Sequence, residues 1–165
     1  MSSARKLLWW SAFALALWGM SFGFWYAVFV EHQTLDRLGA HLATAFMRAA
    51  GRDLPAAHAS LASYAATEFV YVRHVDVHSH WIGLALLLFV LGAGFDRLAI
   101  GRRQQYYLAV ALCAGSAIFP LGVMLQTMMS GPLPDVLAIA GAAMVVVALA
   151  VVALGFARPS THPGT

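Results

Sequence analysis

Three histidines and an aspartate lie close together in the segment Arg73-His74-Val75-Asp76-Val77-His78-Ser79-His80. Imidazole nitrogens and carboxylate oxygens bind transition metals, and imidazole also takes up and releases protons near neutral pH. An uninterrupted apolar run begins directly after this segment, at Trp81. The residue types of this segment, called the histidine cluster below, therefore suit metal, haem or proton chemistry at the entrance to a membrane.

Helical spacing divides the histidine cluster into two faces, because each residue of an α-helix turns about 100°. His74 and His78 share one face, and Asp76 and His80 share a roughly opposite one. The polar residues also alternate as in a strand, but the helical periodicity on both sides favours a helix. In a first arrangement His78 is an axial ligand of a haem b, with His74 or His80 as the next choice. The other axial ligand then comes from another helix, for which the candidates are His32, His41 and a methionine.

A second arrangement holds a bare metal ion. Two histidines of the cluster would bind it together with Asp76 or Glu31, as imidazole and carboxylate sites do. Methionine sulfur is a soft ligand, so Met128 and its neighbours would favour copper over zinc. A third interpretation needs no cofactor, because histidines at a membrane interface often only finish a helix end. Asp76 would then form an ion pair with Arg73.

The composition indicates that lipid surrounds much of the chain. Of the 165 residues, 61% are hydrophobic and 10% are charged, whereas soluble domains usually carry about 25% charged residues. The net charge of +3 reflects a few arginines and does not form a patch for nucleic acid. A single cysteine, Cys113, allows no intrachain disulfide, and no Cys-x-x-Cys-His for covalent c-type haem occurs. No G-x-S-x-G or H-E-x-x-H motif of a hydrolase occurs either.

Four apolar segments are long enough to cross a bilayer, which takes roughly 20 helical residues. The sequence predicts spans at about residues 7–30, 78–96, 105–128 and 135–157. Gly19 and Gly23 form a G-x-x-x-G pair that could admit a close helix neighbour. Pro120 predicts a kink in the third span. The predicted fold is therefore an all-α integral membrane protein with one membrane domain, residues 1–165.

The polar insert between the first two spans, residues 31–77, is also predicted to be helical. Leu35, Leu38, Leu42 and Phe46 recur at helical spacing and predict an amphipathic helix that ends near Ala50. Asp53 suits an N-cap and Pro55 a first helical turn, so a second helix follows. This second helix is able to continue without a break into the second span. The insert is thus predicted to be a helical hairpin over about 34–76, and residues 158–165 a short, loose tail.

The charges near the ends of the spans predict the orientation. Six basic residues and one acidic residue fall at the termini and in the second connection: Arg5, Lys6, Arg97, Arg102, Arg103 and Arg158 against Asp96. The insert has four basic and five acidic residues. By the positive-inside rule, both termini are cytoplasmic and residues 31–77 lie in the periplasm of a bacterium, outside its inner membrane. The histidine cluster, Glu31, His32 and Met128 then all lie at the outer membrane boundary.

The segment Val75–Leu84 resembles the H-x-H-x-x-x-L-G element that opens a helix in short four-helix bacterial membrane proteins of unknown function. A related element occurs in haem-containing membrane proteins of the nitric-oxide-response type, which are grouped with haem–copper oxidase subunits. In this register His78 matches the second histidine and Gly83 the glycine, whereas Asp76 replaces the first histidine. The resemblance implies a haem-related setting, singles out His78 and weakens Asp76 as a ligand.

Two functions of different classes follow. The first is a haem b or copper site at the periplasmic face that serves electron transfer or redox sensing. A haem at one face cannot carry electrons across the whole membrane, so this function implies a partner membrane subunit or a second copy, with a quinol as a further partner. The second is a non-catalytic membrane subunit or scaffold without a cofactor. It would pack against partner helices through small residues of the last two spans: Ala111, Gly115, Ala138, Gly141 and Ala142.

Overall fold

The protein is helical in a computed structural model that describes residues 1–157, and this part of the chain contains no strand. Four stretches are long and apolar enough to cross a membrane. Their helices are α1 (Ser3–Tyr26), α3 (Leu54–Gly94), α4 (Arg102–Leu125) and α5 (Pro132–Ala157). The prediction of an all-helical chain with four apolar spans is confirmed at this level. The predicted tail, residues 158–165, lies outside the described residues.

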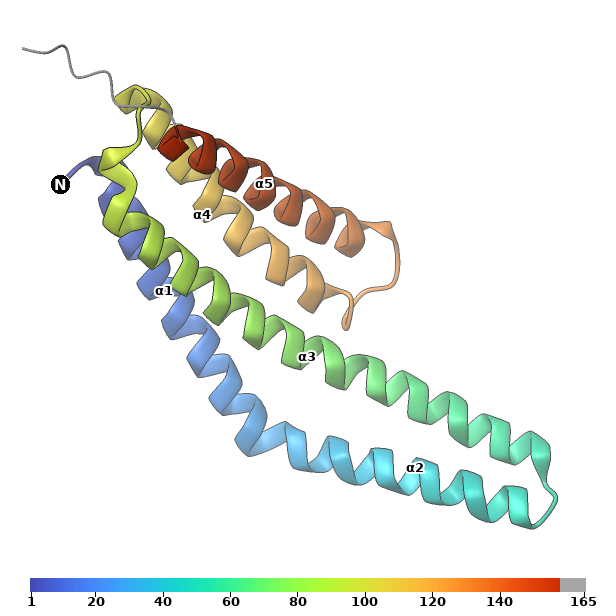
Figure 1. Ribbon diagram of the computed structural model, residues 1–165. Helices are drawn as coiled ribbons and strands as arrows, with labels where there is room; N and C mark the ends of the chain where they lie inside the picture. The colour runs from blue at the N-terminus through green and yellow to red at the C-terminus, as the bar shows by residue number, and fades with distance from the viewer. Residues whose placement is uncertain (158–165) are drawn as a thin grey trace, which may run out of the picture.

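The helices form two antiparallel pairs (Figure 1). Helix α1 packs along α3, and the α4–α5 pair lies beside them, with α4 in contact with both α1 and α3. Helix α2 (His32–Ala50) pairs with the first half of α3. Figure 1 shows that this hairpin extends well past the turn between α4 and α5. The chain therefore has a four-helix part and a two-helix extension.

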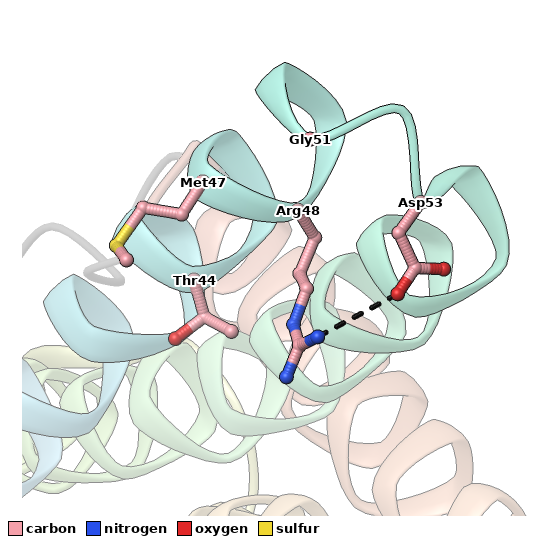
Figure 2. Close-up of a pocket in the computed structure, with 5 residues that line it drawn as sticks. All are labelled: Thr44, Met47, Arg48, Gly51 and Asp53. Carbon is pink, nitrogen blue, oxygen red and sulfur yellow. Dashed lines mark ion pairs between the residues drawn. The ribbon is translucent and has the colours of Figure 1, made fainter.

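Helix α3 is continuous from Leu54 to Gly94. The span predicted at 78–96 is accordingly the second half of a longer helix, as the periodicity allowed. The helix begins where the sequence predicts, because the Asp53 carboxylate accepts a hydrogen bond from the Ala56 amide at 3.3 Å. Across the hairpin turn Arg48 forms an ion pair with Asp53 at 3.6 Å (Figure 2).

The first span, predicted to end near residue 30, and the amphipathic helix, predicted to begin near residue 34, are joined directly. A π-helical turn, η1 (Ala27–Glu31), joins α1 to α2 without interruption. The chain changes direction at this turn (Figure 1). No glycine or proline occurs between Gly23 and Gly39, so no residue there stops a helix. A π-turn redirects the axis while the backbone amides stay hydrogen-bonded.

The α4–α5 pair is joined by close backbone contact at small residues. A Cβ atom on Gly122 would overlap the backbone of Ala138, and one on Gly141 would overlap the backbone of Phe119. A Cβ atom on Gly115 would come within 2.9 Å of the Gly141 carbonyl oxygen. Gly115, Gly122 and Gly141 therefore hold α4 closely against α5 within the chain.

Candidate functional site

The three histidines of the cluster all lie on α3, so the helical interpretation of residues 74–80 is confirmed. The predicted division into two faces is also present. His74 and His78 contact residues of α1, whereas His80 contacts Phe119 of α4. One helix thus presents imidazoles to two of its neighbours, α1 and α4.

His78 joins α3 to α1. Its Nδ1 lies 2.9 Å from the carbonyl oxygen of Gly19, and a Cβ atom on Gly23 would overlap its ring. One turn further along α3, Trp81 is almost fully buried, and its Cβ lies 3.0 Å from the position of a Cβ on Gly19. The G-x-x-x-G pair of α1 is therefore the gap into which His78 and Trp81 of α3 fit.

His74 packs in an aromatic stack on α1. Its ring lies nearly parallel to those of Tyr26, at a centroid distance of 5.0 Å, and Phe22, at 5.9 Å. Its Nδ1 lies 2.8 Å from the carbonyl oxygen of Val70 on the preceding turn of α3. The Tyr26 hydroxyl is buried and has no hydrogen-bond partner within the described residues.

His80 lies on the opposite side of α3. Its ring packs edge-to-face against the Phe119 ring, with the ring centroids 4.6 Å apart and an interplanar angle of 71°. Its Nδ1 lies 2.6 Å from the carbonyl oxygen of Asp76. His80 therefore belongs to the interface of α3 with α4, away from the two histidines that face α1.

The three rings share one hydrogen-bonding arrangement, because each places Nδ1 against a backbone carbonyl oxygen. A carbonyl oxygen only accepts hydrogen bonds, so Nδ1 is the nitrogen that carries the proton. In the neutral ring Nε2 then has the free lone pair. This is the tautomer of a metal-bound histidine that is oriented by a backbone carbonyl, with Nε2 as the ligand atom.

The histidines lie deeper in the bundle than the sequence predicts. Glu31 of η1 marks the end of the first span, and its Oε1 accepts a hydrogen bond at 3.4 Å from the hydroxyl of Tyr71 on α3. His78 is seven residues further along α3, which corresponds to about 10 Å of helix. The histidine pair that faces α1 is thus inside the four-helix part, beside aromatic rings, rather than at its rim.

The two carboxylates proposed as ligands are engaged elsewhere. Asp76 Oδ2 lies 3.5 Å from Arg73 Nη1, which is the local ion pair expected if Asp76 has no metal role. Glu31 pairs with Tyr71 as described above. Neither carboxylate forms an ion pair with a histidine of the cluster within the described residues. Both therefore have a partner other than the cluster.

The residues proposed as the opposite axial ligand are not brought to His78. His32 has an 87% exposed side chain, and its Nε2 lies 3.6 Å from Asp36. His41 is 18 residues beyond Gly23, which is roughly 27 Å along the helices. Met128 follows the end of α4 and is 68% exposed. The α4–α5 turn does lie beside the start of the histidine cluster, since Met129 and Arg73 line one pocket, whereas α2 leads away from the bundle (Figure 1).

Within residues 1–157 no three His, Cys, Asp or Glu side chains are grouped so that they could hold a metal ion. His74 and His78 face α1 whereas His80 faces α4, and this separation explains why the three do not form one group. A haem needs only one or two protein ligands, so this result concerns a metal ion held by several side chains and does not bear on a haem.

Several residues around the cluster are not apparent from its own spacing. Phe22 and Tyr26 cover His74, and Phe119 covers His80. The spacing of Phe22 and Tyr26, four residues apart on one helix face, was a usable signal.

No protein-family model, curated protein or solved structure matches the chain. The function must therefore be argued from the histidines themselves.

Proposed function

We propose that this protein is a bacterial inner-membrane protein that holds a haem b through His78 and serves electron transfer or redox sensing. The observation that supports this proposal is the orientation of His78. Its Nδ1 lies against the Gly19 carbonyl oxygen across the helix interface, which leaves Nε2 as a ligand atom. Polar groups inside membrane helices are costly and usually functional, and His78 lies about two turns inside the bundle.

The proposed orientation follows from the positive-inside rule. The connection between α3 and α4, which includes Arg97 and Arg102, and the N-terminus with Arg5 would face the cytoplasm. The α2–α3 hairpin would stand in the periplasm, and the histidine cluster would lie in the periplasmic half of the bilayer. In support of this, Arg5 forms an ion pair with Asp96 at 3.7 Å, so the N-terminus and this connection lie at the same end of the bundle.

In this proposal the chain's residues bind and orient the group, while a haem iron supplies reversible one-electron chemistry when it is bound. His78 would hold the haem through its Nε2. One turn further along α3, the Trp81 ring packs against Phe22 of α1, with the ring centroids 5.4 Å apart. A partner subunit or a second copy would take the electron further, because no histidine occurs beyond His80 in the part of α3 to α5 that the structure describes.

The visible spectrum tests the haem proposal. The protein is expressed with a haem precursor, purified in mild detergent and measured oxidised and reduced. We expect a Soret band that disappears in His78→Ala and persists in His58→Ala, since His58 is exposed on the hairpin. Absence of the band from the wild type would reject the haem. Metal analysis of the same samples tests the copper alternative.

A non-catalytic membrane subunit is the second candidate, and α1 favours it. Only 11% of the residues in the apolar segment of the first span are buried, against 39% in α4. The exposed side chains of α1 are large: Trp10, Phe13, Leu17, Trp18 and Phe24. In this second candidate a partner helix packs on these side chains of α1. A complex that survives mild-detergent purification and is unchanged by alanine at all three cluster histidines would support this function.

A further inference from the structure

The end of the bundle opposite the hairpin has a basic hollow of about 540 Å³ between the beginnings of α1 and α4. The N-terminus and the α3–α4 connection lie together at this end (Figure 1). The residues that line the hollow, called the basic hollow below, are Ser2, Ser3, Ala4, Arg102, Arg103 and Tyr106. The basic hollow therefore brings two guanidinium groups together with serine hydroxyls, all of which donate hydrogen bonds.

The two arginines of the basic hollow carry charge that no carboxylate of the described residues neutralises by an ion pair. Asp96 is the acidic residue at this end, and other groups engage it. The hydrogen bond from the Ser2 side chain and the charge of Arg5 hold the pKa of the Asp96 carboxyl below its usual range, and Arg5 forms an ion pair with it at 3.7 Å. Arg102 and Arg103 are both exposed, so an anion that enters the basic hollow can reach them.

The backbone adds positive charge at the same place, because α1 begins at Ser3 and α4 begins at Arg102. The first amides of a helix have no partner within it and form the positive end of the helix dipole. The N-cap residue of α4 is Gly101, which has no side chain to accept hydrogen bonds from them. Arginine binds phosphate oxygens through two parallel hydrogen bonds. The basic hollow thus suits a phosphate group held mainly by the two guanidinium groups.

A second, apolar hollow adjoins the basic one across a single pair of side chains. Arg103 places Nε and Nη2 at 3.4 and 3.3 Å from the hydroxyl oxygen of Tyr107. Tyr107 in turn lines a hollow of about 460 Å³ between α4 and α5, together with Ile100, Gln104, Leu108, Ala111 and Val151. Both helices are long and apolar enough to cross a membrane. A phosphate at Arg103 is therefore next to a path for a hydrocarbon chain, which favours a lipid over a free phosphate.

We propose that the two hollows together bind one anionic phospholipid. Its phosphate lies between Arg102 and Arg103, and one acyl chain passes Tyr107 and follows the hollow between α4 and α5. Tyr106 and Tyr107 are 45% and 57% exposed, as is usual for tyrosines at the level of the head groups. In the proposed orientation this lipid belongs to the cytoplasmic leaflet. The site lies at the other end of the bundle from the histidine cluster, so it does not depend on the haem.

The test of the head-group part uses the full-length protein, delipidated in mild detergent, and native mass spectrometry. We expect dioleoylphosphatidylglycerol to bind at least about fivefold more tightly than dioleoylphosphatidylcholine, because the arginines repel the choline cation. The double variant Arg102→Gln/Arg103→Gln should weaken binding of phosphatidylglycerol at least about tenfold, since charge-assisted hydrogen bonds are lost. The control Arg37→Gln/Arg52→Gln removes the same charge from exposed positions of the hairpin and should bind as the wild type does.

A second pair of variants tests the acyl-chain part. Val151→Trp fills the hollow between α4 and α5 from a position that is 41% exposed, and should weaken binding of phosphatidylglycerol several-fold. Val146→Trp, at an exposed position of α5 outside this hollow, is its control and should have no effect. Circular dichroism of each variant checks that the helices are intact.

Equal binding of the two lipids by the wild type would overturn the inference, as would binding of phosphatidylglycerol that the Arg102/Arg103 variant leaves unchanged. Inorganic phosphate is added as a competitor to distinguish the two sources of a phosphate group. Complete displacement of the lipid by low-millimolar phosphate, with no effect of Val151→Trp, would overturn the lipid in favour of a soluble phosphate ligand. Little displacement, with weaker binding in Val151→Trp, is the result expected for a phospholipid.

Discussion

The imidazole of His78 occupies the space that a side chain at Gly23 would fill, and its Nδ1 lies 2.9 Å from the carbonyl oxygen of Gly19. This contact couples two properties that mutations can separate. It holds α1 against α3, and it fixes the tautomer and direction of the ring. A change on α1, a helix that has no histidine of its own, should therefore alter both stability and the proposed ligand.

Gly23→Ala tests this coupling. The new Cβ would overlap the His78 ring, so the ring must move and its hydrogen bond to Gly19 is lost. We expect a destabilisation of about 1–3 kcal/mol from overpacking, together with a weakened or shifted Soret band. Thermal unfolding in detergent, followed by circular dichroism, and the visible spectrum measure the two effects.

Gly83→Ala is the matched control, since nothing lies within 4 Å of a Cβ at that position of α3. It should stabilise the helix by up to about 1 kcal/mol, the difference in helix propensity between the two residues, and leave the spectrum unchanged. Equal unfolding temperatures for the Gly23 and Gly83 variants would show that the α1–α3 contact is not as close as described.

The interface between α4 and α5 gives a second prediction. In Gly122→Val the side chain would run into the backbone of Ala138, which cannot move aside as a side chain can. We expect a destabilisation of at least about 3 kcal/mol, at the upper end of overpacking effects. Ala150→Val, on an exposed face of α5, should be nearly neutral. Unfolding midpoints of the two variants in the same detergent make the comparison.

The spans could be predicted because hydrophobicity alone decides them, and the ends of α4 and α5 fall within three residues of the predicted limits. The depth of the histidine cluster within the bundle could not be predicted from the sequence. It depends on where α1 bends and α4 ends relative to α3, and a π-turn such as η1 leaves no glycine or proline signal. Gly19 and Gly23 indicated a close neighbour, but not that His78 and Trp81 would be that neighbour. Met128 lies just past the end of α4, close to the predicted end of the third span, and its side chain is exposed.

The π-turn gives a third prediction, at the hydrogen bond from Tyr71 to Glu31. This bond connects α3 to the point where α1 becomes α2. Tyr71→Phe should weaken the local structure by about 1 kcal/mol and raise amide hydrogen exchange in Ala27–Glu31. Tyr64→Phe is the control, because Tyr64 donates to Glu68 within α3 on an exposed face. Unchanged exchange at η1 in the Tyr71 variant would mean that other packing holds the bend.

The proposed orientation gives the last prediction, through single cysteines placed at the two ends of the bundle. In a Cys113→Ala background, His58→Cys puts a thiol on the exposed hairpin and Lys6→Cys puts one at the exposed N-terminus. The positive-inside rule assigns these ends to opposite sides of the membrane. In intact spheroplasts, a membrane-impermeant maleimide should label the thiol at position 58 and reach position 6 only after permeabilisation. The reverse labelling would put the hairpin on the cytoplasmic side, where a periplasmic redox partner could not reach the histidine cluster.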